Sequence, residues 1–292
     1  MPQPSCHWWN GNAQMMDQVG GNVRRQSGDF SWFEPLEPLG GIGHLVMTTR
    51  HGGRSQPPFD SLNLGMHVGD VGERVRLNRI ALAKALGRRL QAPVVGEQVH
   101  GTTTQLVGEL HAGTRWEQNE KSLAATDALV TGSRRLPLVT LVADCVPIAL
   151  VDPVRQVGGV VHAGWRGLSG GIIESAVDAL RSTWGSKASE LIAWVGPCIG
   201  PCCYEVGEEV AEHFPRDLAP GADNRSHLDL RSATRKRLAI QGLNSENIAG
   251  LELCTACNPE LFFSHRRATK EGLSATGRQA LILWLEPDLD RR

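Results

Sequence analysis

Three side chains that could bind a metal ion together, His100, Cys145 and His162, stand out in this sequence. Two imidazoles and one thiolate form a ligand set that zinc enzymes use, with the fourth position open for water or substrate. Cys145 and His162 lie at or near the ends of predicted buried strands, where a fold can hold a reactive group still and partly open. The residue types therefore indicate a catalytic metal site.

The spacing of these residues does not identify such a site by itself, because it is unlike the short ligand spacings of zinc fingers. A cysteine after an apolar run is commonly a core thiol. A lone histidine commonly caps an element or forms a structural hydrogen bond. Both interpretations stay open at the level of spacing.

Apolar runs around Cys145 and His162 predict the strands that position them. Residues 138–143 end at Asp144-Cys145, residues 148–151 lead to a turn at Asp152-Pro153, and residues 157–161 lead into His162. Runs of this length between turn signals are typical of strands buried on both faces.

Helices and further strands are predicted around this centre. Apolar periodicity predicts helices over 73–86, 170–184 and 231–241, the first ended by Gly87 and the third by Gly242. Strand candidates include 45–50, 191–196, 248–253, 262–267 and 280–285. There is no regular βαβ period and no GxGxxG or P-loop motif, so we expect an α+β fold with layered sheets.

Composition limits the class of protein. The chain has 292 residues, 41% of them hydrophobic, which suits one large domain or two small ones. A net charge of −1 gives no global attraction to nucleic acid or to a membrane surface. No apolar stretch approaches the roughly 18 residues that span a bilayer, and the N-terminus lacks a secretory pattern. We expect a soluble cytoplasmic protein that binds neither membrane nor nucleic acid.

The seven cysteines are expected to be reduced thiols in such a protein. Cys254 and Cys257 have CxxC spacing, which we interpret as two incidental thiols at a strand end. Cys198, Cys202 and Cys203 could form a second site for a soft metal, but the Gly-Pro pattern around them favours a rigid loop.

The first 35 residues are predicted to be an extension outside the catalytic domain. Pro, Gln, Asn and Gly dominate there, without helical or strand periodicity, so we expect partial disorder. The catalytic domain is expected to span residues 36–292.

Several motifs, taken together and in order, resemble those of the laccase-domain proteins, also known as YfiH/DUF152-like or polyphenol oxidase proteins. The resemblance covers about residues 42 to 285. The segments that carry it are Thr49-Arg50-His51-Gly52-Gly53-Arg54-Ser55, Ser61-Leu62-Asn63-Leu64-Gly65, His67-Val68-Gly69-Asp70, Asn78-Arg79, Gln98-Val99-His100-Gly101, Asp127-Ala128-Leu129-Val130-Thr131, Ala143-Asp144-Cys145-Val146-Pro147, His162-Ala163-Gly164-Trp165-Arg166-Gly167, Gly196-Pro197-Cys198-Ile199-Gly200, Tyr204-Glu205-Val206-Gly207, Phe262-Phe263-Ser264-His265-Arg266-Arg267 and Thr276-Gly277-Arg278.

The resemblance implies a four-layer α/β/β/α fold, which is shared with deamidating toxins, and a zinc ion bound by His100, Cys145 and His162. It also implies phosphorolysis of adenosine, inosine, guanosine and methylthioadenosine, and deamination of adenosine. Deamination needs an activated water at C6 of the purine, which one open zinc can provide.

Substrate-binding residues are also predicted with the family in view. Arg79 is the first candidate for a phosphate clamp, with Arg50 and the Gly52-Gly53 backbone as second choices. The alternative for Arg79 is an ordinary surface arginine on a helix. Asn63 and Gln98 are further candidates for substrate contact, although Gln98 could instead point outward.

Asp144, next to the predicted thiolate, is included among the catalytic candidates. It either orients a ligand imidazole or caps a turn. One departure from the family lies at His265, where members often have tyrosine, so a role for that hydroxyl is in doubt here.

Three rival functions remain. A copper-dependent phenol oxidase is less favoured, because none of the ten histidines forms a His-x-His pair. A metal-free cysteine hydrolase would use Cys145 as nucleophile and His162 or His100 as base. A non-enzymatic nucleotide-binding domain is the third.

Overall fold

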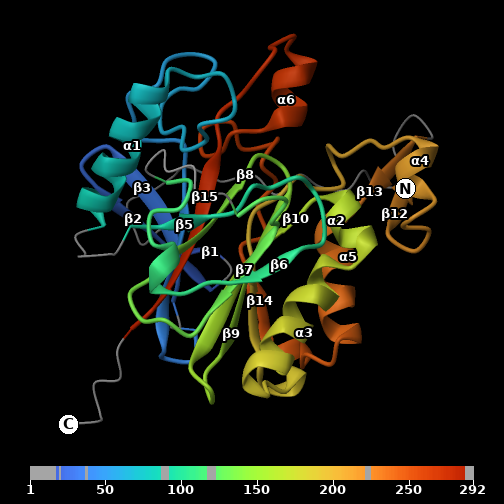
Figure 1. Cartoon of the computed structure of the whole chain (residues 1–292). Coiled ribbons are helices and arrows are strands. Elements are labelled where there is room, and N and C mark those ends of the chain that lie inside the picture. The colour runs from blue at the N-terminus through green and yellow to red at the C-terminus, as the bar shows by residue number, and fades with distance from the viewer. Residues whose placement is uncertain are drawn as a thin grey trace.

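The computed structural model of the protein describes residues 18–19, 21–36, 39–86, 92–116, 123–220 and 225–286. Two large sheets form its centre (Figure 1). The seven-stranded sheet has the spatial order β1 (Gln18–Val19), β2 (Asn22–Ser27), β3 (Phe30–Pro35), β4 (Gly43–Thr48), β15 (Gln279–Leu285), β8 (Leu138–Val142) and β5 (Val94–Val95). The six-stranded sheet has the order β14 (Ile248–Gly250), β11 (Ile192–Val195), β9 (Val146–Asp152), β10 (Val157–Ala163), β7 (Ala128–Thr131) and β6 (Thr104–Leu106).

The remaining elements surround these sheets. A two-stranded ribbon is formed by β12 (Leu218–Pro220) and β13 (Ser226–Leu228). The α-helices are α1 (Gly72–Ala85), α2 (Trp165–Gly170), α3 (Ile172–Trp184), α4 (Glu208–Ala211), α5 (Leu230–Ile240) and α6 (His265–Lys270). Short 3-10 segments lie at Glu109–His111, Ala188–Glu190 and Ser245–Asn247.

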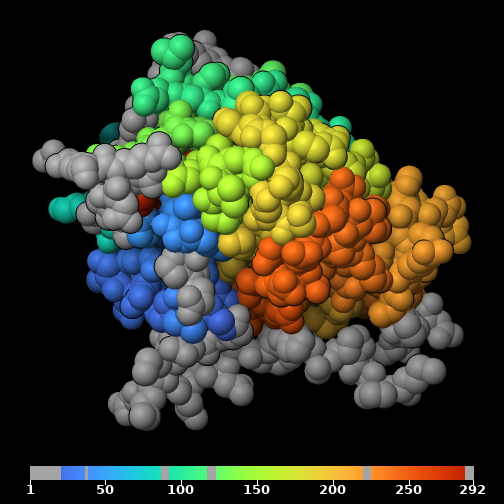
Figure 2. Space-filling model, turned by 90° about the horizontal axis from the view of Figure 1, so that it is seen from below, coloured from blue at the N-terminus to red at the C-terminus, as the bar shows by residue number. Residues whose placement is uncertain are grey.

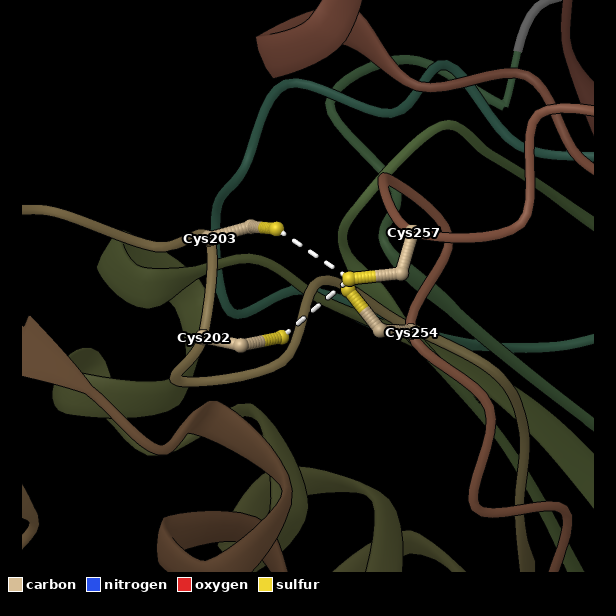
Figure 3. Close-up of side chains that lie close together, drawn as sticks. All are labelled: Cys202, Cys203, Cys254 and Cys257. Carbon is tan, nitrogen blue, oxygen red and sulfur yellow. Dashed lines mark hydrogen bonds between the residues drawn. The ribbon is translucent and has the colours of Figure 1, made fainter. Parts of the chain in front are cut away.

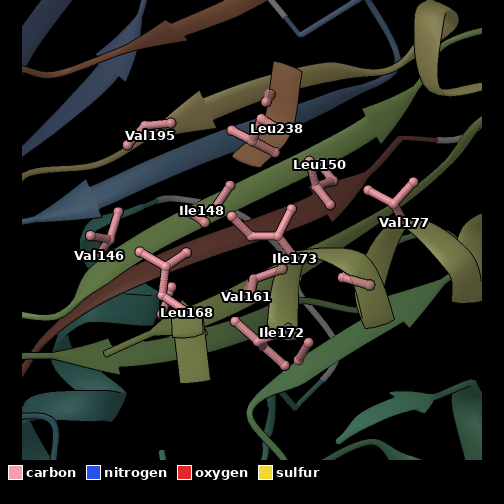
Figure 4. Packing of buried hydrophobic residues seen from close by; sticks show 14 of the residues in the cluster. Val146, Ile148, Leu150, Val161, Leu168, Ile172, Ile173, Val177, Val195 and Leu238 are labelled. Atoms are coloured by element: carbon pink, nitrogen blue, oxygen red, sulfur yellow. The ribbon is translucent and has the colours of Figure 1, made fainter. Parts of the chain in front are cut away.

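Three large apolar layers in the described part of the chain hold the helices and sheets together. One layer joins the two sheets and contains Met47 and Leu281 from one sheet and Val160 and Trp194 from the other. A second layer packs α3 and α5 on the six-stranded sheet. Figure 4 shows part of it, with Ile148 and Leu150 from β9 near Ile173 and Val177 from α3. A third layer includes Leu82 of α1 and Trp284 of β15. The predicted four-layer α/β/β/α fold is confirmed.

A β-hairpin positions two of the proposed metal ligands. β9 and β10 pair antiparallel with His162 opposite Pro147 and Ala163 opposite Val146. Cys145 directly precedes β9, so this register brings the thiol close to His162. At the far end of the hairpin, Asp152 accepts hydrogen bonds from the backbone N–H groups of Val154 and Arg155, as the predicted turn requires.

The prediction that the first 35 residues lack strands is wrong for residues 22–35. β2 and β3 pair with each other, and β3 pairs with β4 of the seven-stranded sheet. Trp32 and Phe33 are buried, and the amide of Asn22 bonds Gly250 and Trp194. In Figure 2 the blue N-terminal segment accordingly lies beside the orange C-terminal half. Residues 1–17 and 20 lie outside the described residues.

Two further elements differ from the expected ones. The predicted strand over 262–267 is instead an irregular segment followed by α6, because the Ser264 side chain accepts a hydrogen bond from the backbone N–H of Arg267 and caps the helix. The predicted helix over 170–184 begins at Ile172, since Gly171 adopts a positive φ of 100° and separates α2 from α3.

In the part of the chain that the structure describes, no helix combines the length and the apolar character needed to cross a membrane.

Candidate active site

The three predicted metal ligands line one cavity of about 390 Å³. Their candidate ligand atoms all lie within 4.8 Å of one another. Cys145 Sγ is 3.6 Å from His100 Nε2, and the rings of His100 and His162 lie edge to face with centroids 4.8 Å apart. The structure therefore brings together three residues that are distant in sequence.

Asp127, directly before β7, bonds the backbone of the segment that carries His100 and the imidazole of His162. Its carboxylate accepts hydrogen bonds from the backbone N–H groups of Val99, His100 and Gly101 at 3.2, 3.0 and 2.8 Å. It also lies 2.8 Å from His162 Nδ1. This contact leaves His162 Nε2 for the cavity, and the backbone contacts hold His100 at a positive φ of 62°.

Opposite charges shift the pKa values of this group. Burial alone would raise the pKa of Cys145, but the charge of His162 and a hydrogen bond to His100 lower it from 9.0 to about 6. Burial would lower the pKa of His162, but Cys145 and Asp127 raise it to about 9. The pKa of Asp127 is lowered because hydrogen bonds from His162, Gly101 and Val99 outweigh burial. Without a metal, the thiolate and imidazolium forms therefore stabilise each other.

A glycine after β10 leaves room for this group. A Cβ on Gly164 would lie 2.6 Å from His100 Cδ2 and 3.1 Å from Cys145 Sγ. Any larger residue there would displace a ligand, which explains the glycine between His162 and α2.

These residues fit a zinc ion by donor type and by distance. Zinc binds sulfur at about 2.3 Å and nitrogen at about 2.0–2.1 Å, so adjacent ligand atoms should lie about 3.5 Å apart. The separation of 3.6 Å between Cys145 Sγ and His100 Nε2 meets this requirement. The hydrogen bond from His162 Nδ1 to Asp127 adds the outer partner that metal-binding histidines usually have.

Asp144 lines the cavity but does not orient an imidazole. Its carboxylate accepts hydrogen bonds from Thr255 Oγ1 at 2.6 Å and from the backbone N–H of Arg266 at 2.7 Å. Asp144 thus supports the start of α6, and its predicted role toward the histidines belongs to Asp127. The position of Asp127 directly before an apolar strand was the available sequence signal.

Arg79 and Arg50 do not reach this cavity. The Arg79 side chain is buried, donates to the backbone carbonyls of Leu64, Arg115 and Trp116, and lies over the Trp116 ring. Arg50 donates to Asp60 and to the carbonyl of Pro259. The structure therefore places neither guanidinium group in the cavity and gives the predicted phosphate-clamp roles no support. The Gly52-Gly53 backbone also lies outside the cavity.

Gln98 and Asn63 have different placements. Gln98 lines the cavity, but both ends of its amide pair with the backbone of Leu141. Asn63 is fully buried and does not line the cavity; its Oδ1 accepts a hydrogen bond from the backbone N–H of Arg278. Asn63 therefore positions a cavity residue without facing the cavity.

The positive charge in the cavity comes from arginines other than the predicted phosphate clamps. Arg166, Arg266 and Arg278 line it, and the signal for each was its place in a family motif. Burial lowers the pKa of His67, another lining residue, to about 4, with the charge of Arg278 acting in the same direction, so its imidazole is neutral at pH 7. Aromatic walls are formed by Trp165 and Tyr204, and His265 also faces the cavity.

Residues 44–286 match the family model described as multi-copper polyphenol oxidoreductase laccase. The chain is 38% identical to purine nucleoside phosphorylase YlmD of Geobacillus stearothermophilus over 229 residues, which are 76% of this chain and 84% of the relative. It is 37% identical to purine nucleoside phosphorylase YfiH of Escherichia coli over 245 residues, 82% of this chain and 92% of the relative.

Solved structures give the same result for the fold. The crystal structure of Geobacillus stearothermophilus YlmD matches with a TM-score of 0.84 and 33% identity, covering 91% of this chain and 100% of that one. A Bacillus licheniformis protein named YfiH matches with a TM-score of 0.82 and 32% identity, covering 90% and 99%.

Proposed function

The chain belongs to the laccase-domain family, and from this premise we propose that it is a zinc-dependent purine nucleoside phosphorylase. Relatives named purine nucleoside phosphorylase align over most of their length. The observation that carries the proposal is the convergence of His100, Cys145 and His162 in a cavity that also contains three arginines. We place the enzyme in the cytoplasm, where thiols such as those of Cys145 and Cys198 stay reduced and where the disulfide of Cys257 meets reductants.

Phosphorolysis requires an anion site beside the sugar. A phosphate oxygen forms a bond to C1′ of the ribose while the glycosidic bond breaks. The electron pair of the glycosidic bond leaves with the purine, which then takes up a proton. The guanidinium groups of Arg166, Arg266 and Arg278 supply the charge that holds phosphate. Arg166 is partly fixed by stacking on Trp165, at 4.3 Å from the ring centre.

The purine and the sugar need different surfaces. Trp165 and Tyr204 offer aromatic faces for stacking of the base. The neutral His67 imidazole accepts a hydrogen bond from a ribose or phosphate hydroxyl. The zinc ion would be held by His100, Cys145 and His162, and when bound it would act as a Lewis acid on the substrate or on water.

The proposed substrates are adenosine, inosine, guanosine and methylthioadenosine, with deamination of adenosine as a second activity. Zinc is preferred to copper because one thiolate and two imidazoles form a three-ligand set with an open position, the arrangement of catalytic zinc sites. Metal analysis of protein purified without added copper tests this assignment, and stoichiometric copper would overturn it.

A cysteine hydrolase is the second candidate, because Cys145, His162 and Asp127 form a Cys-His-Asp arrangement. His100 on the other side of the thiol favours the metal instead, since a hydrolase needs that side open for substrate. A chelator separates the two functions. The zinc enzyme loses activity on chelation, whereas a hydrolase keeps its activity and loses it with iodoacetamide.

The central test is phosphate-dependent release of hypoxanthine from inosine by the Cys145→Ala variant. We expect kcat/KM to fall at least about 100-fold, because loss of an outer partner alone costs 10–100-fold. Cys198→Ala is the matched control: its thiol is buried and lies outside the cavity, so its activity should stay close to that of the wild type. Full turnover by Cys145→Ala would reject the proposed site.

A further inference from the structure

A second group of side chains that could bind a metal lies beside the catalytic cavity. The sulfur atoms of Cys202, Cys203, Cys254 and Cys257 all lie within 4.8 Å of one another. Figure 3 shows two of these residues on one loop and two on a turn, with all four sulfurs directed to a common centre. Cys257 Sγ is 3.4 Å from both Cys202 Sγ and Cys203 Sγ.

The backbone around Cys254 is arranged to stabilise a thiolate. The N–H of Gly200 donates to Cys254 Sγ at 3.2 Å, and the N–H of Cys257 donates to the same sulfur. The turn itself is closed by Asn258, whose backbone and side-chain N–H groups both donate to the Cys254 carbonyl. Hydrogen bonds of this kind orient and stabilise sulfur ligands.

The distances suit one ion bound by four sulfurs. A tetrahedral zinc site with bonds of about 2.3 Å places its sulfurs about 3.8 Å apart. The separations of 3.4 Å and the upper limit of 4.8 Å bracket this value. An iron–sulfur cluster needs its thiolates farther apart, because they bind different iron atoms.

We propose that Cys202, Cys203, Cys254 and Cys257 form a second, structural zinc site that fills when the disulfide of Cys257 is reduced. Cys202, Cys203 and Cys254 are free thiols, whereas Cys257 is disulfide-bonded, so the expectation of reduced cysteines is wrong for Cys257. A dithiol reductant transfers two electrons and two protons to this disulfide, giving two thiols and an oxidised dithiol. Zinc then displaces protons from the four cluster thiols into solvent.

This zinc would hold two segments that build the catalytic cavity. Tyr204, next to Cys203, lines the cavity. Thr255, between the two turn cysteines, donates to Asp144 beside the catalytic thiol. Zinc release on oxidation would loosen both segments, so we expect the site to couple the redox state of the protein to the order of its cavity.

The test uses the full chain with the catalytic ligands removed by the His100→Ala/Cys145→Ala substitutions. After reduction with a dithiol and desalting, this variant should bind one equivalent of zinc. With cobalt in its place, it should show the charge-transfer bands of a tetrahedral site with four thiolates. Adding Cys203→Ser should abolish the zinc equivalent and weaken those bands, whereas adding the matched substitution Cys198→Ala should change neither.

Three results would overturn the proposal: no metal bound by the reduced protein, a zinc equivalent that survives Cys203→Ser, or iron as the bound metal. If a variant fails to fold, the cobalt spectrum of the reduced wild-type protein tests the proposal instead. This spectrum should show a second set of bands from the four-cysteine site. The oxidised protein should bind one zinc equivalent less than the reduced protein.

Discussion

At the scale of single residues, the site is organised by a carboxylate that does not line the cavity. Asp127 fixes the loop that carries His100 through three backbone contacts and fixes the ring of His162 directly. It therefore sets the positions of two ligands at once. Positions within about 0.5 Å matter for such sites, so this outer residue has a large effect on binding.

Asp127→Asn should weaken zinc binding by about 10–100-fold, because the amide cannot accept hydrogen bonds from all of these donors. Zinc affinity measured by competition with a chromophoric chelator checks this. Asp152→Asn is the control, since Asp152 is also buried and also accepts from backbone N–H groups, but at the far end of the β9–β10 hairpin. Equal affinities in wild type and Asp127→Asn would contradict the positioning role.

The metal-free protein should show a pH-dependent thiol. Because the pKa of Cys145 is lowered to about 6, alkylation by iodoacetamide should have its midpoint there. Cys198 is the internal control, since burial raises its pKa to about 12. Mass spectrometry locates the adduct, and zinc should protect Cys145. A midpoint near 9 would show that His162 and His100 do not stabilise the thiolate.

The same pair shapes the stability of the metal-free protein. Because the pKa of Cys145 is lowered on folding, its thiolate adds to the free energy of unfolding at pH values above the unfolded pKa. This stabilisation is lost as the pH falls through about 6. Because the pKa of His162 is raised on folding, its imidazolium adds to the free energy of unfolding at pH values below the unfolded pKa. This stabilisation is lost as the pH rises through about 9.

At the scale of elements, the β9–β10 hairpin and helix α1 have different tasks. The hairpin positions two of the proposed ligands, Cys145 and His162, and its register sets their separation. α1 supports the opposite sheet, and Arg79 ties it to the segments around Leu64 and Trp116. An arginine inside a helix thus joins elements here, and its guanidinium group lies outside the cavity.

Arg79→Ala should lower the free energy of unfolding by about 3 kcal/mol, because three buried carbonyl groups lose their donor. The KM for phosphate of the folded fraction should not change. Urea unfolding and phosphate kinetics together measure both effects. Arg76→Ala, on the exposed side of the same helix, should change neither value. A selective rise in the KM for phosphate would restore the clamp role.

At the scale of the whole molecule, two stacked sheets hold the cavity, and the N-terminal strands belong to this framework. β3 extends the seven-stranded sheet, and Asn22 reaches across to Gly250 at the edge of the other sheet. Residues 22–35 therefore contribute to the same core as the catalytic residues.

Phe33→Ala should lower the free energy of unfolding by about 3–5 kcal/mol, since Phe33 is fully buried between the sheets. The half-buried Phe30, in the same strand, should give a smaller loss when changed to alanine. Chemical denaturation measures both. An unchanged free energy of unfolding in Phe33→Ala would indicate that residues 22–35 form an extension separate from the core.

Apolar runs and turn residues predicted the strands and helices of an α+β fold, because these are local signals, whereas the family motifs implied the four-layer arrangement and the three proposed metal ligands. The apolar run before Cys145 and the one before His162 predicted the strands that carry them. The N-terminal strands were not predicted from the sequence, because Arg and Gln interrupt the apolar pattern of β2.

Only the tertiary structure decided which polar residue meets which. Asp127 and not Asp144 bonds the ring of His162, because the packing of the strands sets which carboxylate reaches that ring. Arg278 and not Arg79 lines the cavity, since Arg79 is turned to backbone carbonyls. The four cysteines likewise meet only where two distant loops pack side by side. Contacts between distant segments depend on packing in three dimensions, and no local pattern of residues encodes that.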